Sequence, residues 1–156
     1  MIIGLFACSI QLIAQPMLQG PAIPDIIVDV VFSDSLDTIK LQSHEYERIN
    51  KIDFVSIRYI KQDEEVLSIK SVVLTYDLDG DKPLYQVDLM FSSTLDAYKM
   101  AYDFYGLPNY ANQGNVLNEW YFRQPNNLSD VWISLAANTL VIRALEPNTI
   151  WEAKVY

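Results

Sequence analysis

The residue types best suited to acid–base chemistry lie together at His44, Glu45 and Glu47. A histidine beside carboxylates can act as a general base or supply part of a metal site. A zinc-protease helix needs a second histidine one helical turn further on, and that position holds Arg48. No Gly-x-Ser-x-Gly turn presents a nucleophile for a serine triad. We therefore interpret this segment as a solvated polar loop and assign no catalytic residue.

The other chemistry-bearing residues are too few or too dispersed for common sites. One cysteine, Cys8, and one histidine rule out a disulfide framework or a Cys/His zinc site within one chain. The five glycines form no phosphate-binding loop. Carboxylates are plentiful, but glycoside hydrolysis also needs a cleft and one carboxyl with a raised pKa, and the sequence indicates neither. We expect no cofactor and a function other than catalysis.

One acidic link has the spacing of a calcium loop. Asp77, Asp79 and Asp81 fall at positions one, three and five of an EF-hand, and Asp88 falls at position twelve. Lys82 stands where the loop needs glycine, Asp88 replaces the bidentate glutamate, and the flanking residues have the pattern of strands. The link also holds an Asp-Gly pair, which favours a tight hairpin. We interpret it as an acidic hairpin tip, with weak calcium binding as the alternative.

An amide-rich loop from Asn109 to Asn118 precedes a strand that begins with aromatic residues. Amides beside exposed aromatic rings hold sugars or peptides by hydrogen bonds and stacking. Loops are also amide-rich for backbone reasons alone, and the tryptophan can equally point inward. A structural loop is the leading interpretation, and a carbohydrate or peptide site is the alternative. The residues of that candidate site are Tyr110, Asn112, Asn115, Trp120 and Tyr121.

Length and composition predict one self-sufficient domain. The chain has 156 residues, 51% of them hydrophobic, and a net charge of −9. That is enough apolar material for a core without metal or disulfide. A surface that binds nucleic acid needs clustered Lys and Arg, and here the basic residues are scattered along the sequence. We exclude nucleic acid as a partner and expect a protein or a glycan.

The N-terminal segment predicts export. Residues 1–14 are almost wholly apolar and match the core of a secretory signal cleaved after Ala14, although a basic start is missing and Leu12 is bulky. The segment is too short to span a bilayer as a helix. Residues 5–8, Leu-Phe-Ala-Cys, also resemble a lipoprotein box. We expect a periplasmic or secreted protein, with a lipid anchor at Cys8 and a cytoplasmic location as alternatives.

The next residues lead into the domain. Residues 15–24 are rich in proline and predict an extended linker, and residues 25–156 are expected to form one domain. Ile and Val dominate residues 26–32, which predicts a first strand. The last ten residues, from Pro147, are expected to add an edge strand.

The region 33–50 gives no sustained period. Ser35 and Asp37 are candidate caps of a turn, and residues 46–52 are a candidate short helix. Alternation returns in residues 54–59, which predicts a strand ending at a charged turn.

Two strands and a helix form the clearest unit of the sequence. Residues 72–76 and 85–91 alternate between apolar and other side chains, as half-buried strands do, and the Asp-Gly link makes them antiparallel neighbours. A helix over 93–105 follows, with Asp96 in its first turn, Gly106 at its end and Pro108 beyond it. A row of residues at helical spacing is expected to pack on the sheet, with a ligand face as the alternative: Leu95, Tyr98, Tyr102 and Tyr105.

The last third of the chain holds this helix, Gly106-Leu107-Pro108, the amide loop, Trp120-Tyr121-Phe122 and alternating strands near 131–135 and 140–144. The order resembles the β-lactamase-inhibitor-protein/SmpA-OmlA-like group of small exported bacterial α+β domains, in which a helix ends in a Gly-x-Pro turn before a Trp-bearing strand. That group has a helix pair where this sequence has strands before one clear helix. The resemblance implies a non-enzymatic, protein-contacting role and transfers no functional residue.

Together these features predict an α+β domain. A mostly antiparallel sheet of about six strands is expected to pack one face against one main helix, over 93–105. The expected function is that of a small exported bacterial binding or structural module. The alternative is a carbohydrate- or peptide-binding domain that uses the loop 109–118 and its adjacent aromatic residues.

Overall fold

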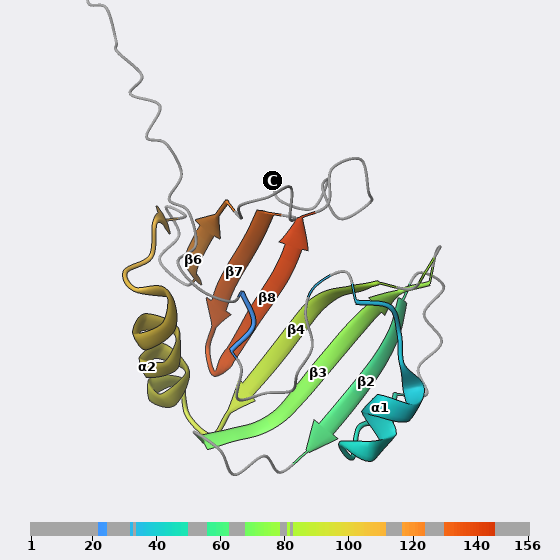
Figure 1. Cartoon of the computed structure of the whole chain (residues 1–156). Helices are drawn as coiled ribbons and strands as arrows, with labels where there is room; N and C mark the ends of the chain where they lie inside the picture. The colour runs from blue at the N-terminus through green and yellow to red at the C-terminus, as the bar shows by residue number, and fades with distance from the viewer. Residues whose placement is uncertain are drawn as a thin grey trace, which may run out of the picture.

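The computed structural model describes residues 22–24, 32, 34–49, 56–62, 68–78, 81, 83–111, 117–123 and 130–145. Figure 1 shows their arrangement as one curved sheet with helices beside it. In chain order the elements are α1 (Thr38–Ser43), β1 (Glu47–Arg48), β2 (Ser56–Gln62), β3 (Ile69–Asp77), β4 (Leu84–Phe91), α2 (Thr94–Tyr105), β5 (Tyr110–Ala111), β6 (Leu117–Phe122), β7 (Asp130–Ala136) and β8 (Thr139–Leu145).

The strands form one antiparallel sheet in the order β1-β2-β3-β4-β8-β7-β6-β5. The pairing of β4 with β8 joins the N-terminal strands to the C-terminal ones. The predicted α+β class with an antiparallel sheet is confirmed for the described residues. The predicted count of about six strands is low, since eight strands pair there. The edge strands β1 and β5 have two residues each, too short for the alternation that reveals a strand in a sequence.

The predicted hairpin is confirmed as β3 and β4, which pair in register from Ser71 with Met90 to Thr75 with Gln86. Bulges lie at both ends of this run. In β4 the residues Tyr85, Val87, Leu89 and Phe91 are buried and the residues between them are less so, as the alternation predicts. The strand predicted over 54–59 is present as β2 in its described part, and those near 131–135 and 140–144 are present as β7 and β8.

Helix α2 begins and ends where its sequence predicts. The Ser93 hydroxyl oxygen accepts from the backbone N–H of Asp96 at 3.2 Å and donates to the Asp96 carboxylate at 2.7 Å. At the other end Gly106 has φ 73° and ψ −156°, a backbone conformation open almost only to glycine, and its N–H donates to the carbonyl of Tyr102 at 2.9 Å. The helix therefore starts on a serine cap and stops on a glycine.

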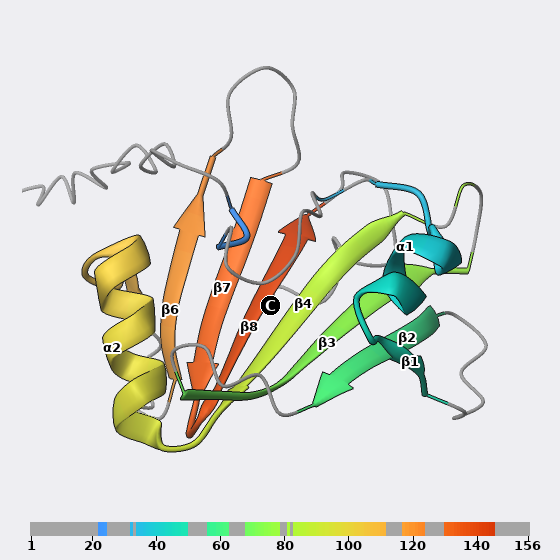
Figure 2. The same cartoon turned by 60° about the horizontal axis from the view of Figure 1, so that its bottom comes forward.

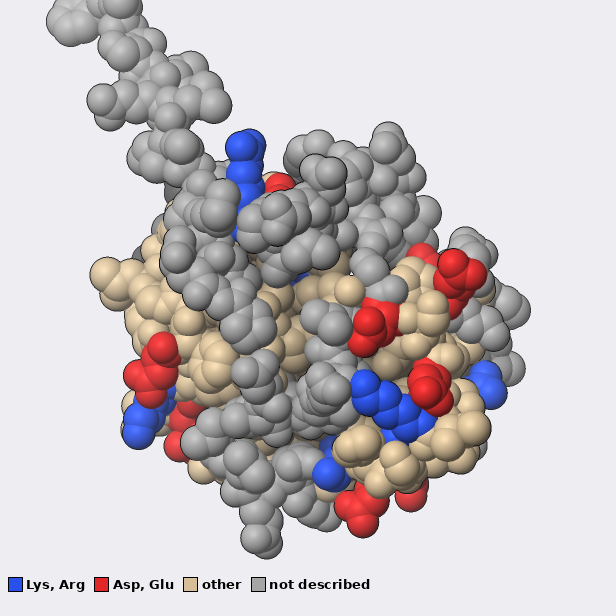
Figure 3. All heavy atoms as spheres, viewed as in Figure 1, with Lys and Arg blue, Asp and Glu red and all other residues tan. Residues whose placement is uncertain are grey.

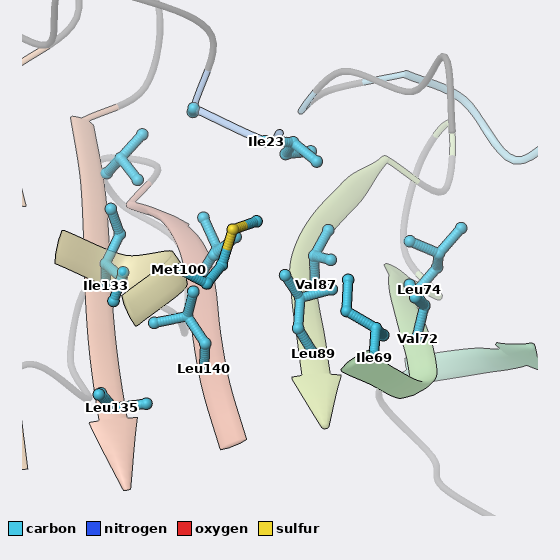
Figure 4. Close-up of a cluster of buried hydrophobic side chains, with 14 of the residues drawn as sticks. Ile23, Ile69, Val72, Leu74, Val87, Leu89, Met100, Ile133, Leu135 and Leu140 are labelled. Atoms are coloured by element: carbon cyan, nitrogen blue, oxygen red, sulfur yellow. The ribbon is translucent and has the colours of Figure 1, made fainter. Parts of the chain in front are cut away.

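The two faces of the sheet differ in what covers them. On one side, here called the closed face, α1 and α2 pack over a single cluster of buried apolar side chains. Figure 4 shows Met100 of α2 between Ile133, Leu140 and the side chains of β3 and β4, which point toward a common interior. On the other side, here called the open face, no described helix lies against the strands (Figures 1 and 2). The described apolar cluster thus lies on the closed face alone.

The face that α2 turns to the sheet differs from the predicted row. Ala97, Met100, Ala101 and Tyr105 are buried against the strands. Leu95 is 77% exposed and Tyr102 is 36% exposed, so the predicted row is wrong at these two residues. It is confirmed at Tyr105, which is buried, and in part at Tyr98, which is partly buried and packs against the core cluster. The helix is rotated because two small alanines let its backbone approach the sheet more closely than a row of tyrosines would.

Four further predictions, three about the N-terminal part and one about the C-terminal end, have mixed outcomes. Asp37 caps α1, accepting from the N–H groups of Ile39 and Lys40 at 3.0 Å each. The candidate helix over 46–52 is wrong in its described part, since Glu47 and Arg48 form β1. The strand predicted over 26–32 and the edge strand predicted from Pro147 fall outside the described residues, apart from Phe32, which lies in a turn.

Part of the predicted linker packs into the domain. Ile23 is 4% exposed and belongs to the core cluster, and the carbonyl oxygen of Ala22 accepts from the hydroxyl of buried Tyr105 at 2.9 Å. Figure 2 shows this short blue segment over β7 and β8. The packed unit therefore includes Ala22–Pro24.

Candidate functional site

A continuous row of directly paired residues crosses the open face from β2 to β6. Neighbouring strands place their paired residues on the same side of a sheet, so these side chains form one line. Adjacent strands lie about 4.8 Å apart, which puts the first arginine about 14 Å from the second. We call this row the open-face ladder; its members are Arg58, Thr75, Gln86, Arg143, Trp132 and Tyr121.

The centre of the ladder is a hydrogen-bonded network. Arg143 donates from Nε and Nη2 to the Gln86 amide oxygen, at 2.9 and 2.6 Å. The Gln86 amide nitrogen in turn donates to a carboxylate oxygen of Asp88 at 2.7 Å. Because both ends of the amide are occupied, Gln86 is held in one orientation and fixes the position of the guanidinium.

Burial governs the charge of Asp88. Desolvation raises the pKa of this carboxyl, and the Gln86 hydrogen bond and the charges of Arg143 and Arg58 act in the opposite direction. The carboxylate is therefore less favourable at this half-buried position than it is in water, and the two arginines offset part of that cost.

Two aromatic side chains continue the ladder beyond Arg143. Trp132 and Tyr121 are half-buried, and their rings meet edge to face with centroids 5.9 Å apart. The Tyr121 hydroxyl donates to Asp130 at 2.6 Å, and burial together with this carboxylate raises the pKa of Tyr121 to about 12. Tyr121 therefore stays a neutral donor, and the ring pair has a fixed geometry next to the guanidinium.

A third arginine lies near the aromatic end of the ladder. Arg123 is exposed and follows Tyr121 by two residues, a spacing that returns the side chain of an extended chain to the same face. Its positive charge lowers the pKa of Tyr121, although burial outweighs that effect. The open face therefore carries Arg58, Arg143 and Arg123, three of the four arginines of the chain.

The charges on the other side of the molecule have a different distribution. Figure 3, viewed from the side of the helices, shows the described acidic and basic side chains interspersed rather than gathered by sign. Arginine is better suited than lysine to planar, bidentate contacts with carboxylates and phosphates and to stacking on rings. The described gathering of arginine with aromatic side chains thus distinguishes the open face.

Two polar side chains of the open face are buried. The Thr75 hydroxyl makes no hydrogen bond in the structure. The Glu119 side chain is 6% exposed on β6, and burial raises the pKa of its carboxyl. Glu119 and Asp88 lie in one cross-strand row, but three strand spacings, about 14 Å, separate them. Glycosidase carboxyls lie about 5–9.5 Å apart, so these two do not form such a pair.

The structure separates the residues of the predicted amide-loop site. Trp120 is fully buried on the closed face, and its indole N–H donates to the Gly106 carbonyl at 3.0 Å, so its ring offers no surface for stacking. Asn109 exchanges two hydrogen bonds with the backbone of Tyr121, at 3.0 and 2.7 Å, a structural role. Tyr121 lies on the opposite face from Trp120, on the open-face ladder.

The side chains of the other three residues of that candidate site, Tyr110, Asn112 and Asn115, are not described. Tyr110 belongs to β5 opposite Glu119, and nothing further is described of its side chain. Asn112 and Asn115 lie outside the described residues, so a ligand site in this loop stays a prediction.

The other candidate residues do not converge. Exposed His44 ends α1, with Nδ1 2.9 Å from the Lys40 carbonyl oxygen, which only accepts, so Nδ1 carries the proton. Asp79 lies outside the described residues, and the calcium prediction for Asp77, Asp79 and Asp81 remains a prediction. Among the residues that the structure describes, no three His, Cys, Asp or Glu side chains group as metal ligands.

The sequence did not single out the open-face ladder. Arg58 and Arg143 each stand between apolar neighbours in alternating strands, which marks them as facing away from the core. Their common row depends on the pairing of β2 with β3, β3 with β4 and β4 with β8, which no local pattern specifies.

Two further findings concern the whole described chain. No described helix has both the length and the apolar character needed to cross a bilayer. No protein-family model, no curated protein and no solved structure matches the chain, so the site is interpreted from its own geometry.

Proposed function

We propose that this chain is a small exported bacterial protein that acts as a non-enzymatic binding module and contacts a protein partner through the open face. The observation that carries the proposal is the open-face ladder, in which arginine, tryptophan and tyrosine lie side by side on a sheet face that no described helix covers. These three residue types dominate the binding energy of protein interfaces. The resemblance to the β-lactamase-inhibitor-protein/SmpA-OmlA-like group implies the same kind of role.

The arrangement of reactive groups favours binding over catalysis. His44 is at the end of α1, whereas the two carboxyls with raised pKa lie on the sheet about 14 Å apart. A catalytic constellation needs such groups within hydrogen-bonding reach of one another or of one substrate. The leader at residues 1–14 supports export.

Site-specific photo-crosslinking tests the proposed surface. A photoreactive phenylalanine analogue would replace Trp132 on the ladder or, as the control, Ile39 on α1, which is 78% exposed. In the cells that make the protein, we expect a discrete adduct from position 132 and none from position 39. No adduct from 132, or equal adducts from both, would overturn the proposal. Circular dichroism of each variant checks that the sheet is intact.

Export has a separate test. Cell fractionation followed by mass spectrometry of the N-terminus should find the protein outside the cytoplasm, beginning near Gln15. A chain in the cytoplasm with Met1 intact would remove the export part of the proposal and leave the binding surface to stand on its own.

A further inference from the structure

We propose that the side chain of Asn109 closes the outer edge of β6, where the backbone cannot, and so keeps a further copy of the chain from adding a strand there. This role concerns the edge of the sheet, and it does not depend on the proposed binding through the open face. Three observations carry it: the register of β5, the position of Pro108, and the two hydrogen bonds between Asn109 and the backbone of Tyr121.

The register of β5 would place a proline opposite Tyr121. Tyr110 pairs with Glu119 in an antiparallel ladder. Two residues further along each strand, the same register would set Pro108 opposite Tyr121. The two residues of a hydrogen-bonded antiparallel pair exchange two N–H···O bonds, one in each direction. Because proline has no N–H, Pro108 could not donate to the Tyr121 carbonyl, and the backbone alone cannot complete the ladder at this residue.

The Asn109 side chain supplies both of these contacts. Its amide nitrogen donates to the Tyr121 carbonyl at 3.0 Å, and its amide oxygen accepts from the Tyr121 N–H at 2.7 Å. A side-chain amide carries a donor and an acceptor next to each other, as a peptide group does, whereas an ionised aspartate of the same size carries only acceptors. Asn109 therefore takes the place of the strand residue that Pro108 cannot be.

These contacts lie on the outer side of β6. All six residues of this strand pair with β7 on its inner side. The N–H and C=O of one residue point to the same side of a strand, and those of Tyr121 point to Asn109. Among the described elements only β5, with two residues, pairs with β6 on the outer side. An edge with unpaired N–H and C=O groups is a template for another strand, so loss of the Asn109 amide should open this edge.

The strand that fits the edge is β6 of a further copy of the chain. Two identical edges can pair antiparallel about a two-fold axis, which gives a closed dimer. Three of the six residues of β6 are aromatic, and aromatic residues favour extended strands. Because the Asn109 amide already satisfies the backbone groups of Tyr121, a second strand has less to gain by pairing there.

Amide hydrogen exchange measured by NMR tests the contact itself. In Asn109→Ala the Tyr121 amide should exchange at least about tenfold faster, relative to the amide of buried Ile133, because its acceptor is lost. Asn138→Ala is the matched control, since it removes a side-chain amide that donates to the Phe91 carbonyl at 2.8 Å from the turn between β7 and β8. In that control the same ratio of exchange rates should change by less than about twofold.

Light scattering after size-exclusion chromatography tests the closure of the edge. Over about a hundredfold range of protein concentration, the molar mass of Asn109→Ala should rise more steeply than that of wild type, because the opened edges pair. Asn138→Ala should behave as wild type does. Asn109→Lys loses the same amide but places a charge on the edge, which opposes strand addition. The lysine variant should therefore show the fast Tyr121 exchange without the rise in molar mass.

Circular dichroism checks that each variant keeps the sheet. Asn109→Ser, whose hydroxyl is too short to replace both contacts of the amide, takes the place of the alanine variant if that variant does not fold. Unchanged relative exchange of the Tyr121 amide in the folded variant would overturn the pairing role of Asn109. Fast exchange without a rise in molar mass, or an equal rise in the lysine variant, would overturn the closure of the edge.

Discussion

The closed and open faces belong to the same strands but are built for different tasks. On the closed face the side chains of β4, β7 and β8 alternate into a fully buried apolar cluster under α2. On the open face most of the intervening residues of these strands are half-buried, and they include Gln86, Arg143 and Trp132. Successive residues of a strand point to opposite sides, so one set of side chains stabilises the fold and the other set is available for recognition. Substitutions on one face should therefore leave the task of the other largely intact.

The largest expected effect comes from the tryptophan of the closed face. Trp120→Ala should lower the free energy of unfolding by about 3–5 kcal/mol, because it leaves a large cavity and removes the hydrogen bond to Gly106. Urea denaturation followed by circular dichroism measures it. Trp132→Ala on the open face is the matched control, with an expected loss below about 1.5 kcal/mol. Equal losses would break the distinction between the two faces.

The next largest loss of stability is expected at Gly106, where α2 ends. Gly106→Ala should lower the free energy of unfolding by about 1–3 kcal/mol, because φ 73° and ψ −156° are strained for any residue with a Cβ. The new Cβ would meet no atom within 4 Å, so the effect would be one of backbone conformation and not of collision. Leu107→Ala, at a neighbour that is 80% exposed, should change stability by less than about 0.5 kcal/mol in the same denaturation experiment. A Gly106→Ala protein as stable as wild type would contradict the prediction.

A somewhat smaller loss of stability is expected at Ser93, where α2 begins. Ser93→Ala removes the side chain that accepts from the Asp96 N–H, and we expect a loss of about 1 kcal/mol in thermal or urea unfolding. Ser92→Ala serves as the control, since Ser92 is bonded through its backbone N–H to the Ser68 carbonyl. If both serine variants lose the same stability, the cap is not what begins the helix that covers the closed face.

The smallest expected effect sharpens the description of the open face. Burial raises the pKa of Glu119 above its ordinary 4.5, so the folded state binds the proton more tightly than the unfolded state does. Wild-type stability should therefore be lost as the pH rises through the folded pKa, and Glu119→Gln should remove that loss. Urea unfolding should show that the free energy of unfolding of the variant, relative to that of wild type, is higher at about pH 7 than at about pH 4.

A neighbouring substitution controls for packing in that experiment. Ser134→Ala, directly opposite on β7, removes no titratable group and should shift stability equally at both pH values. If the difference in unfolding free energy between Glu119→Gln and wild type is the same at both pH values, the raised pKa of Glu119 is contradicted.

Local patterns predicted much of the closed face. The pairing of β3 with β4, the alternation in β4, the helix start near Ser93 and the glycine at Gly106 are decided within a few residues, and all are confirmed. The orientation of α2 was predicted only in part, because the aromatic residues suggested a buried row that holds at Tyr105 and partly at Tyr98 but fails at Leu95 and Tyr102. The helix instead turns Ala97 and Ala101 to the strands, a preference set by the available space and not by hydrophobicity.

The candidate site was less predictable than the fold. Trp120 and Tyr121 are neighbours in sequence, and strand alternation already implies that they point to opposite faces, but the sequence alone does not show which face is covered. The packing of α2 places Trp120 inside, where it contacts Tyr102 and Tyr105, and leaves Tyr121 on the open face. A site composed of both residues was therefore excluded only when the covered face was known.

By itself the sequence determined where strands alternate, where the main helix begins and ends, and that reactive groups are few. Only the tertiary structure decided which of the two faces is closed and which residues meet on the open one. Gln86 and Arg143 are hydrogen-bonded although they lie 57 residues apart, because β4 pairs with β8 in one register. That register is set by packing of the whole sheet, and a shift of one residue would turn the arginine toward the core.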